Sequence, residues 1–70
     1  MKIEFDEKVD AAFVYFKDIS AGEVKRTISL DDNLNIDLDK DGKILGIEIL
    51  NASESIPVSS LSELKEKCIS

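Results

Sequence analysis

The chain has 70 residues, with 15 acidic and nine basic side chains and no histidine, so its formal net charge is −6. This charge repels phosphate backbones and anionic membrane surfaces, which argues against direct binding of nucleic acids or membranes. A chain this short forms one small domain over residues 1–70, and its single cysteine, Cys68, excludes the intramolecular disulfide that often supplements a small core.

The N-terminal residues enter a strand pattern at once. Residues 2–5 alternate polar and apolar side chains, with Ile3 and Phe5 on one side. This start does not resemble a signal peptide, and no apolar run reaches the length of a membrane span, so we expect a cytoplasmic protein. Residues 6–10 turn the chain. Residues 11–16 are apolar on both faces and rich in strand-forming types, which is typical of a central strand covered on both sides.

A hairpin follows the loop at residues 17–22. Residues 23–30 resume the alternation, and Asp31-Asp32-Asn33 predicts a three-residue connection with Asn33 in the left-handed conformation. The expected register pairs Leu30 with Leu34, Ile28 with Ile36, Thr27 with Asp37, Lys25 with Asp39 and Arg26 with Leu38.

The next turn fixes a second register. Asp41-Gly42 favours a two-residue type I′ turn, in which both central residues take positive φ. The strands on either side then pair Leu38 with Leu45, Ile36 with Ile47 and Leu34 with Ile49. All six aliphatic side chains emerge on one face, which we expect to be the buried face.

The C-terminal part predicts one helix. Residues 51–55 leave the sheet, and Pro57 cannot occupy an interior strand or the middle of a helix. Ser60-Leu61-Ser62-Glu63 is a capping-box pattern that opens a helix to about Lys67, with Leu61, Leu64 and Cys68 along one side. We therefore expect an α+β fold, an antiparallel β-meander of about five strands with this short helix packed on the apolar face, which carries Ile36, Leu38, Leu45 and Ile47.

One acidic motif overlaps the second hairpin. Asp37, Asp39, Asp41-Gly42 and Glu48 match the calcium loop of an EF-hand. That motif requires a helix on each side, whereas residues 23–34 alternate as a strand and residues 51–57 cannot form an exiting helix. We expect these carboxylates to lie along a flat hairpin, with calcium binding by Asp37, Asp39, Asp41 and Glu48 as the alternative.

Several stretches carry a family resemblance. These are Phe5-Asp6, Asp10-Ala11-Ala12-Phe13-Val14, the run from Asn35 to Leu50, and Ala52-Ser53. In them the chain resembles the small prokaryotic family known as domain of unknown function 2283, although Phe13 stands where the family usually has tyrosine. The resemblance implies a compact β-rich domain with a C-terminal helix and no established activity. Some relatives appear beside genes for toxin-like proteins, which implies a protein partner.

The residue types argue against catalysis. The chain offers no histidine, no nucleophile with an adjacent base and no phosphate-binding glycine loop, so we expect neither an enzyme nor a bound cofactor. We expect a small interaction module, either a homodimer or one that binds a protein partner, because a single helix cannot cover both faces of the strand at residues 11–16. The candidate interaction residues are Phe13, Tyr15, Phe16, Asp37, Asp39 and Glu48.

Overall fold

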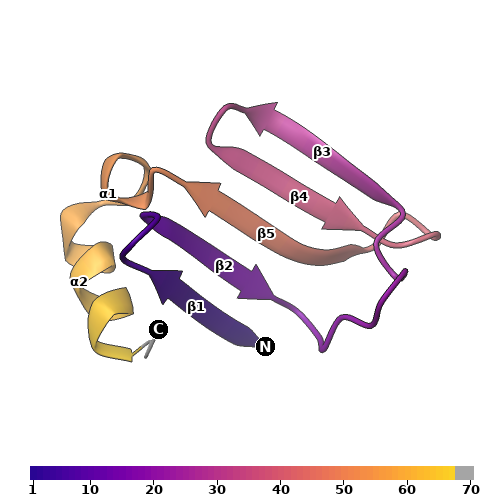
Figure 1. Cartoon of the computed structure of the whole chain (residues 1–70), viewed down its shortest axis with the longest axis horizontal. Coiled ribbons are helices and arrows are strands. Elements are labelled where there is room, and N and C mark those ends of the chain that lie inside the picture. Colours follow the sequence, from indigo (N-terminus) through magenta and orange to yellow (C-terminus); the bar gives the residue numbers. More distant parts are fainter. Residues whose placement is uncertain (68–70) are drawn as a thin grey trace.

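A five-stranded antiparallel sheet followed by two short helices makes up the computed structural model, which describes residues 1–67 (Figure 1). The α+β fold class and the antiparallel sheet expected from the sequence are confirmed. The elements are β1 (Lys2–Asp6), β2 (Ala11–Tyr15), β3 (Arg26–Asp31), β4 (Leu34–Leu38), β5 (Ile44–Leu50), α1 (Ala52–Ser55) and α2 (Val58–Lys67).

The strand order places β5 at the centre of the sheet. The order is β1-β2-β5-β4-β3, so β3, β4 and β5 form a meander, while β2 pairs with β5 instead of with β3 (Figure 1). The connection at residues 16–25 therefore carries the chain from β2 past two strands to the opposite edge. The expected interior position of this strand is confirmed, because β2 lies between β1 and β5. The expected cover on both faces is wrong beyond Ala11 and Ala12, since the rest of β2 is half-buried and Phe16 is 46% exposed.

The hairpin of β4 and β5 keeps most of its predicted register. Leu34 pairs with Ile49 and Ile36 with Ile47, but Leu38 lies opposite Ile44 instead of Leu45. The reason is the turn. The Asp39 N–H donates to the Lys43 carbonyl (2.9 Å), the Gly42 N–H donates to the Asp39 carbonyl (3.0 Å), and of the Asp41-Gly42 pair only Gly42 takes a positive φ, of 80°. This is a three-residue turn followed by a bulge, so the predicted type I′ turn is wrong.

The β3–β4 hairpin differs from its prediction at one end. Arg26, Thr27 and Ile28 pair with Leu38, Asp37 and Ile36 as expected. A bulge between Ser29 and Asp31 then brings Asp31 opposite Leu34, and it leaves Leu30 61% exposed instead of paired with Leu34. Asn33 does not adopt the left-handed conformation, and its N–H donates to the Asp31 carboxylate at 2.7 Å.

The helices cover one corner of the sheet. α2 packs against β1 and α1 against β5, around a core of Phe5, Ala12, Ala52 and Leu61 with Ile49, Ile56 and Leu64 beside it. The helices therefore pack on the predicted apolar face, but over its end at Phe5, Ala12 and Ile49 instead of over Ile36, Leu38, Leu45 and Ile47. The chain leaves β5 at Leu50, directly opposite Ala11, and turns toward the β1 side, so the helices lie at the end of the sheet beside β1 (Figure 1).

The two C-terminal helices differ from the prediction in number and in where they begin. α1 is a single helical turn within residues 51–57, where the sequence predicted none, and α2 begins two residues before the predicted capping box. Cys68 lies outside the described residues. Within residues 1–67, neither helix is long and apolar enough to cross a membrane.

Candidate interaction surfaces

One row of aliphatic side chains crosses the whole sheet. Ile3, Val14, Ile47, Ile36 and Ile28 lie directly opposite one another, one from each strand in the order of the sheet. We call these five residues the isoleucine row. No member of the row is buried, because Ile3 is 42% exposed and the other four are half-buried. The face that carries core-type residues therefore has no second layer over its middle.

Further apolar side chains lie on both sides of the row, along the direction of the strands. Toward the helices lies a hollow of about 440 Å³, which is lined by Asp31, Asn33, Leu34, Ile49, Glu54 and Ser55. On the other side of the row, Leu38 and Leu45 are buried, and Phe16 is 46% exposed. Phe16 follows β2, and its N–H donates to the Leu45 carbonyl at 2.9 Å. By the alternation of β2, this predicted interaction residue lies on the face of Val14.

The opposite face is polar with two aromatic rings on it. Phe13 and Tyr15 lie there as predicted, with stacked rings 6.2 Å apart between their centroids. Phe13 lies between Glu4 and Glu48 on the neighbouring strands. Partial burial raises the pKa of the Tyr15 phenol above its ordinary value of 10.0, and the carboxylates of Glu4, Glu48 and Asp37 raise it further, against Lys2, which lowers it.

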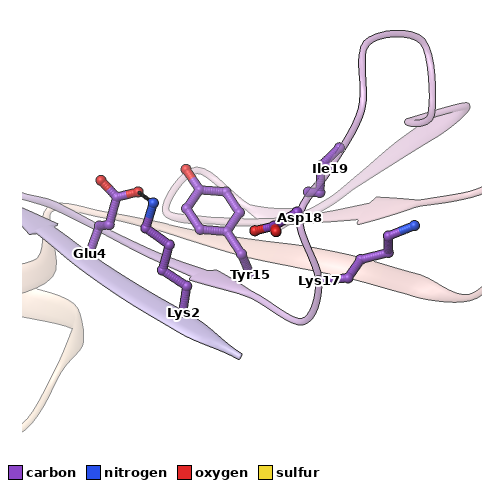
Figure 2. Close-up of a pocket in the computed structure, with 6 residues that line it drawn as sticks. All are labelled: Lys2, Glu4, Tyr15, Lys17, Asp18 and Ile19. Carbon is purple, nitrogen blue, oxygen red and sulfur yellow. Dashed lines mark ion pairs between the residues drawn. The ribbon is translucent and has the colours of Figure 1, made fainter.

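Tyr15 also lines a shallow pocket at the end of this face. Figure 2 shows the pocket, of about 260 Å³, with Tyr15 between Lys2 and Glu4 on one side and the residues after β2 on the other. The Lys2 ammonium forms an ion pair with the Glu4 carboxylate at 3.5 Å, drawn as a dashed line. Lys17, Asp18 and Ile19 complete the lining. Lys2 and Lys17 are each ion-paired, and the raised pKa keeps the Tyr15 phenol protonated at neutral pH, so this tyrosine is not an activated nucleophile.

Gly46 allows β2 and β5 to approach each other closely beside Tyr15. A Cβ added at Gly46 would lie 3.0 Å from the Val14 carbonyl oxygen, 3.5 Å from the Tyr15 ring and 3.6 Å from Ile19. The close approach of β2 and β5 at this point therefore depends on the absence of a side chain. The Gly46 in the predicted apolar strand thus has a structural role beside Tyr15.

An ion pair between Lys17 and Glu23 stabilises the connection between β2 and β3, which borders the pocket. The Lys17 ammonium lies 2.5 Å from a Glu23 carboxylate oxygen, and the other Glu23 oxygen accepts the Ser20 N–H at 2.9 Å. The hydrogen bond from Lys17, followed by that from Ser20, lowers the pKa of Glu23 below its ordinary value, and the same bond to Glu23 raises the pKa of Lys17. Both groups are therefore charged across the neutral range.

The structure does not bring together the carboxylates of the alternative calcium site. Asp37 lies on the polar face opposite Gly46, and its carboxylate accepts the Thr27 hydroxyl at 2.7 Å. Glu48 lies opposite Asn35, while Asp39 belongs to the turn and accepts the N–H groups of Asp41 and Lys43, both at 2.9 Å. The bond from Lys43, then that from Asp41, lowers the pKa of Asp39. Within residues 1–67, no three acidic, cysteine or histidine side chains are grouped closely enough to hold a metal ion.

Asp10 has a role that the sequence reading missed. It adopts a positive φ of 53° at the turn between β1 and β2. Its carboxylate accepts the Ser53 N–H (3.0 Å) and the Ser53 hydroxyl (2.6 Å), and its carbonyl accepts the Ala52 N–H (2.8 Å). Asp10 therefore joins the first hairpin to the start of α1. The presence of both Asp10 and Ala52-Ser53 among the residues that carry the family resemblance was the signal that could have indicated this pairing.

Comparisons with known proteins agree with this resemblance. The model of the family described as protein of unknown function, DUF2283, matches residues 2–53. An uncharacterised protein of the archaeon Methanocaldococcus jannaschii is 42% identical over 65 residues, which cover 93% of this chain and 53% of the archaeal protein. The chain thus spans about half the length of that relative. No solved structure matches the chain. With most of its residues matched by the family model, the chain belongs to the DUF2283 family.

Proposed function

We propose that this chain is a small, non-enzymatic interaction module that binds a protein surface through the isoleucine row. The observation that carries the proposal is that the row has one member on each strand and no buried member. An amphipathic antiparallel sheet is stable when its apolar face packs on another layer, and contiguous exposed apolar surface marks sites of protein association.

The polar face supports a binding role over a catalytic one. Near Tyr15, Lys2 forms an ion pair with Glu4, and Lys17 forms one with Glu23. The acidic side chains Asp37 and Glu48 keep this face hydrated, so it is the solvent side of the module. We further propose a cytoplasmic location, where the single cysteine would remain reduced.

The proposal is tested by capture of partners on the tagged chain from a lysate of the source cells, with two variants of β3. Ile28→Glu places a charge in the isoleucine row on an edge strand, whereas Ser29→Glu places the same charge on the opposite face of the same strand. We expect capture of a defined protein, either the untagged chain itself or another protein, to be lost with Ile28→Glu and kept with Ser29→Glu. Equal capture by both variants, with both folded by circular dichroism, would contradict the proposed contact surface.

A further inference from the structure

We propose that the partner on the isoleucine row is a second copy of this chain, so that two sheets pack face to face as a two-layer β-sandwich. This inference rests on the proposed function, because it names the occupant of the same surface. Three observations point to a second copy: the surplus of accessible surface, the distribution of charge between the two faces, and the position of the row in the sheet.

The accessible surface of the single chain is too large for its mass. A folded monomer of 7.8 kDa is expected to expose about 4,400 Å², whereas this chain exposes 5041 Å². The radius of gyration is 12.4 Å, against about 11 Å expected for 70 residues. The surplus of about 600 Å² approaches the roughly 800 Å² that each partner buries in a stable interface of standard size. Contact with a second protein layer of this chain's own dimensions would bury this surplus surface.

The charges are arranged so that two acidic chains can approach. Each copy carries a net charge of −6, so a random encounter is repulsive. The register places Lys2, Glu4, Asp37 and Glu48 on the polar face. The isoleucine row contains no ionisable group, and Arg26, opposite Leu38 on the apolar face, lies on the edge strand β3. In a face-to-face pair the acidic faces lie outermost, separated by both sheets. A positively charged partner, by contrast, would be complementary in charge to the acidic polar face and not to the uncharged isoleucine row.

The shape of the apolar face also fits a copy of itself. β-branched side chains on a sheet interdigitate with those of a second sheet about 10 Å away, as in β-sandwiches. Ile47 lies on the central strand, so a two-fold axis near it brings Ile36 and Ile47 of one copy against the same pair in the other. The helices occupy the corner over Phe5 and Ala12, which directs the contact toward β5, β4 and β3. The hollow beside Leu34 and Ile49 remains on this face to receive side chains of the partner.

The test is sedimentation equilibrium of the untagged full chain over the micromolar to submillimolar range. We expect a mass of twice 7.8 kDa for the wild type. Ile28→Glu should raise the dissociation constant of the dimer by about 100-fold, because each interface would bury two unpaired carboxylates. Ser29→Glu, the matched control, should change it by less than about threefold, since an exposed charge contributes little. Ile28→Thr keeps the β-branched shape and should raise the constant by about 10-fold, so a result is obtained even if Ile28→Glu does not fold.

The possible results separate this inference from the proposed function. A dimer that is weakened by both Ile28 variants and kept by Ser29→Glu supports the second copy. A dimer that is unaffected by the Ile28 variants overturns the assignment of the face. A wild-type chain that remains monomeric throughout overturns the second copy as partner, whereas row-dependent capture of a different protein would then still uphold the interaction module.

Discussion

At the scale of single residues, Asp10 and Gly46 show how positions without obvious chemistry determine where elements meet. Asp10 accepts two hydrogen bonds from Ser53, which is 43 residues further along the chain. Gly46 allows the β2 backbone to approach β5 at a point where a Cβ would lie 3.0 Å from the Val14 carbonyl. The sequence indicated a turn at Asp10 and a strand at Gly46, but it could not show these contacts, because each depends on an element distant in the chain.

The bonds of Asp10 predict a measurable stability difference. Asp10→Ala removes both bonds to Ser53 and leaves alanine at a positive φ, so we expect it to lower the free energy of unfolding by about 1–2 kcal/mol. Asp10→Asn keeps an acceptor oxygen and a residue that tolerates positive φ, so it should cost less than about half as much. Urea unfolding followed by circular dichroism measures both. An Asp10→Ala protein as stable as the wild type would show that the link to α1 contributes nothing to the fold.

Asp39 predicts a dependence of stability on acid pH. Its N–H donors in the turn lower its pKa below the ordinary 3.8, so its ionised form favours the folded state. This contribution is present above the unfolded-state pKa and is lost as the pH falls through the lower, folded-state value. Asp39→Asn should therefore show a smaller fall in melting temperature than the wild type between pH 5 and pH 2. Asp41→Asn removes a charge from the same turn but not these two bonds, and it should follow the wild-type curve.

At the scale of elements, the β4–β5 hairpin shows what alternation and turn chemistry can each predict. The period-two pattern was sufficient to pair Ile36 with Ile47 and Leu34 with Ile49. The turn type was wrong because the Asp39 carboxylate accepts two N–H groups within the turn, which a rule based on the Asp41-Gly42 pair does not consider. The bulge beside Leu38 compensates for the one-residue change in register, so Leu38 and Leu45 both remain buried.

The same hairpin predicts the result of a calcium titration. A calcium loop encloses the ion with carboxylates and a backbone carbonyl, whereas Asp37 and Glu48 lie along a sheet and Asp39 belongs to the turn. We expect no saturable binding below about a millimolar and no shift of melting temperature at micromolar calcium. Isothermal titration calorimetry measures the binding, with Glu48→Gln as the comparison. Stoichiometric binding that Glu48→Gln abolishes would contradict the arrangement of this hairpin.

At the scale of the whole molecule, local patterns predicted the class of fold but not its assembly. The five strands follow from alternation, and the C-terminal helix follows from its apolar spacing, although the predicted capping box at Ser60 lies inside α2. The strand order and the position of the helices do not, because they depend on which edges pair over long distances. The helices lie over Phe5 and Ala12 since α1 begins beside Asp10, and the middle of the isoleucine row is left half-buried as a result. The interaction residues predicted from the sequence divide between two faces, with Phe16 separated from Phe13 and Tyr15.

The position of β2 beside β5 has a consequence for the order of folding. The β1–β2 hairpin and the β3–β4–β5 meander each contain only contacts between neighbouring segments, and they meet along a single seam between β2 and β5. Closing that seam requires the ends of a long stretch of chain to come together, which is entropically slower than forming a hairpin. We therefore expect two locally formed halves that dock late, with the seam as the rate-limiting contact. Once docked, Asp10 and Ser53 bond across the end of the seam and hold the two halves together.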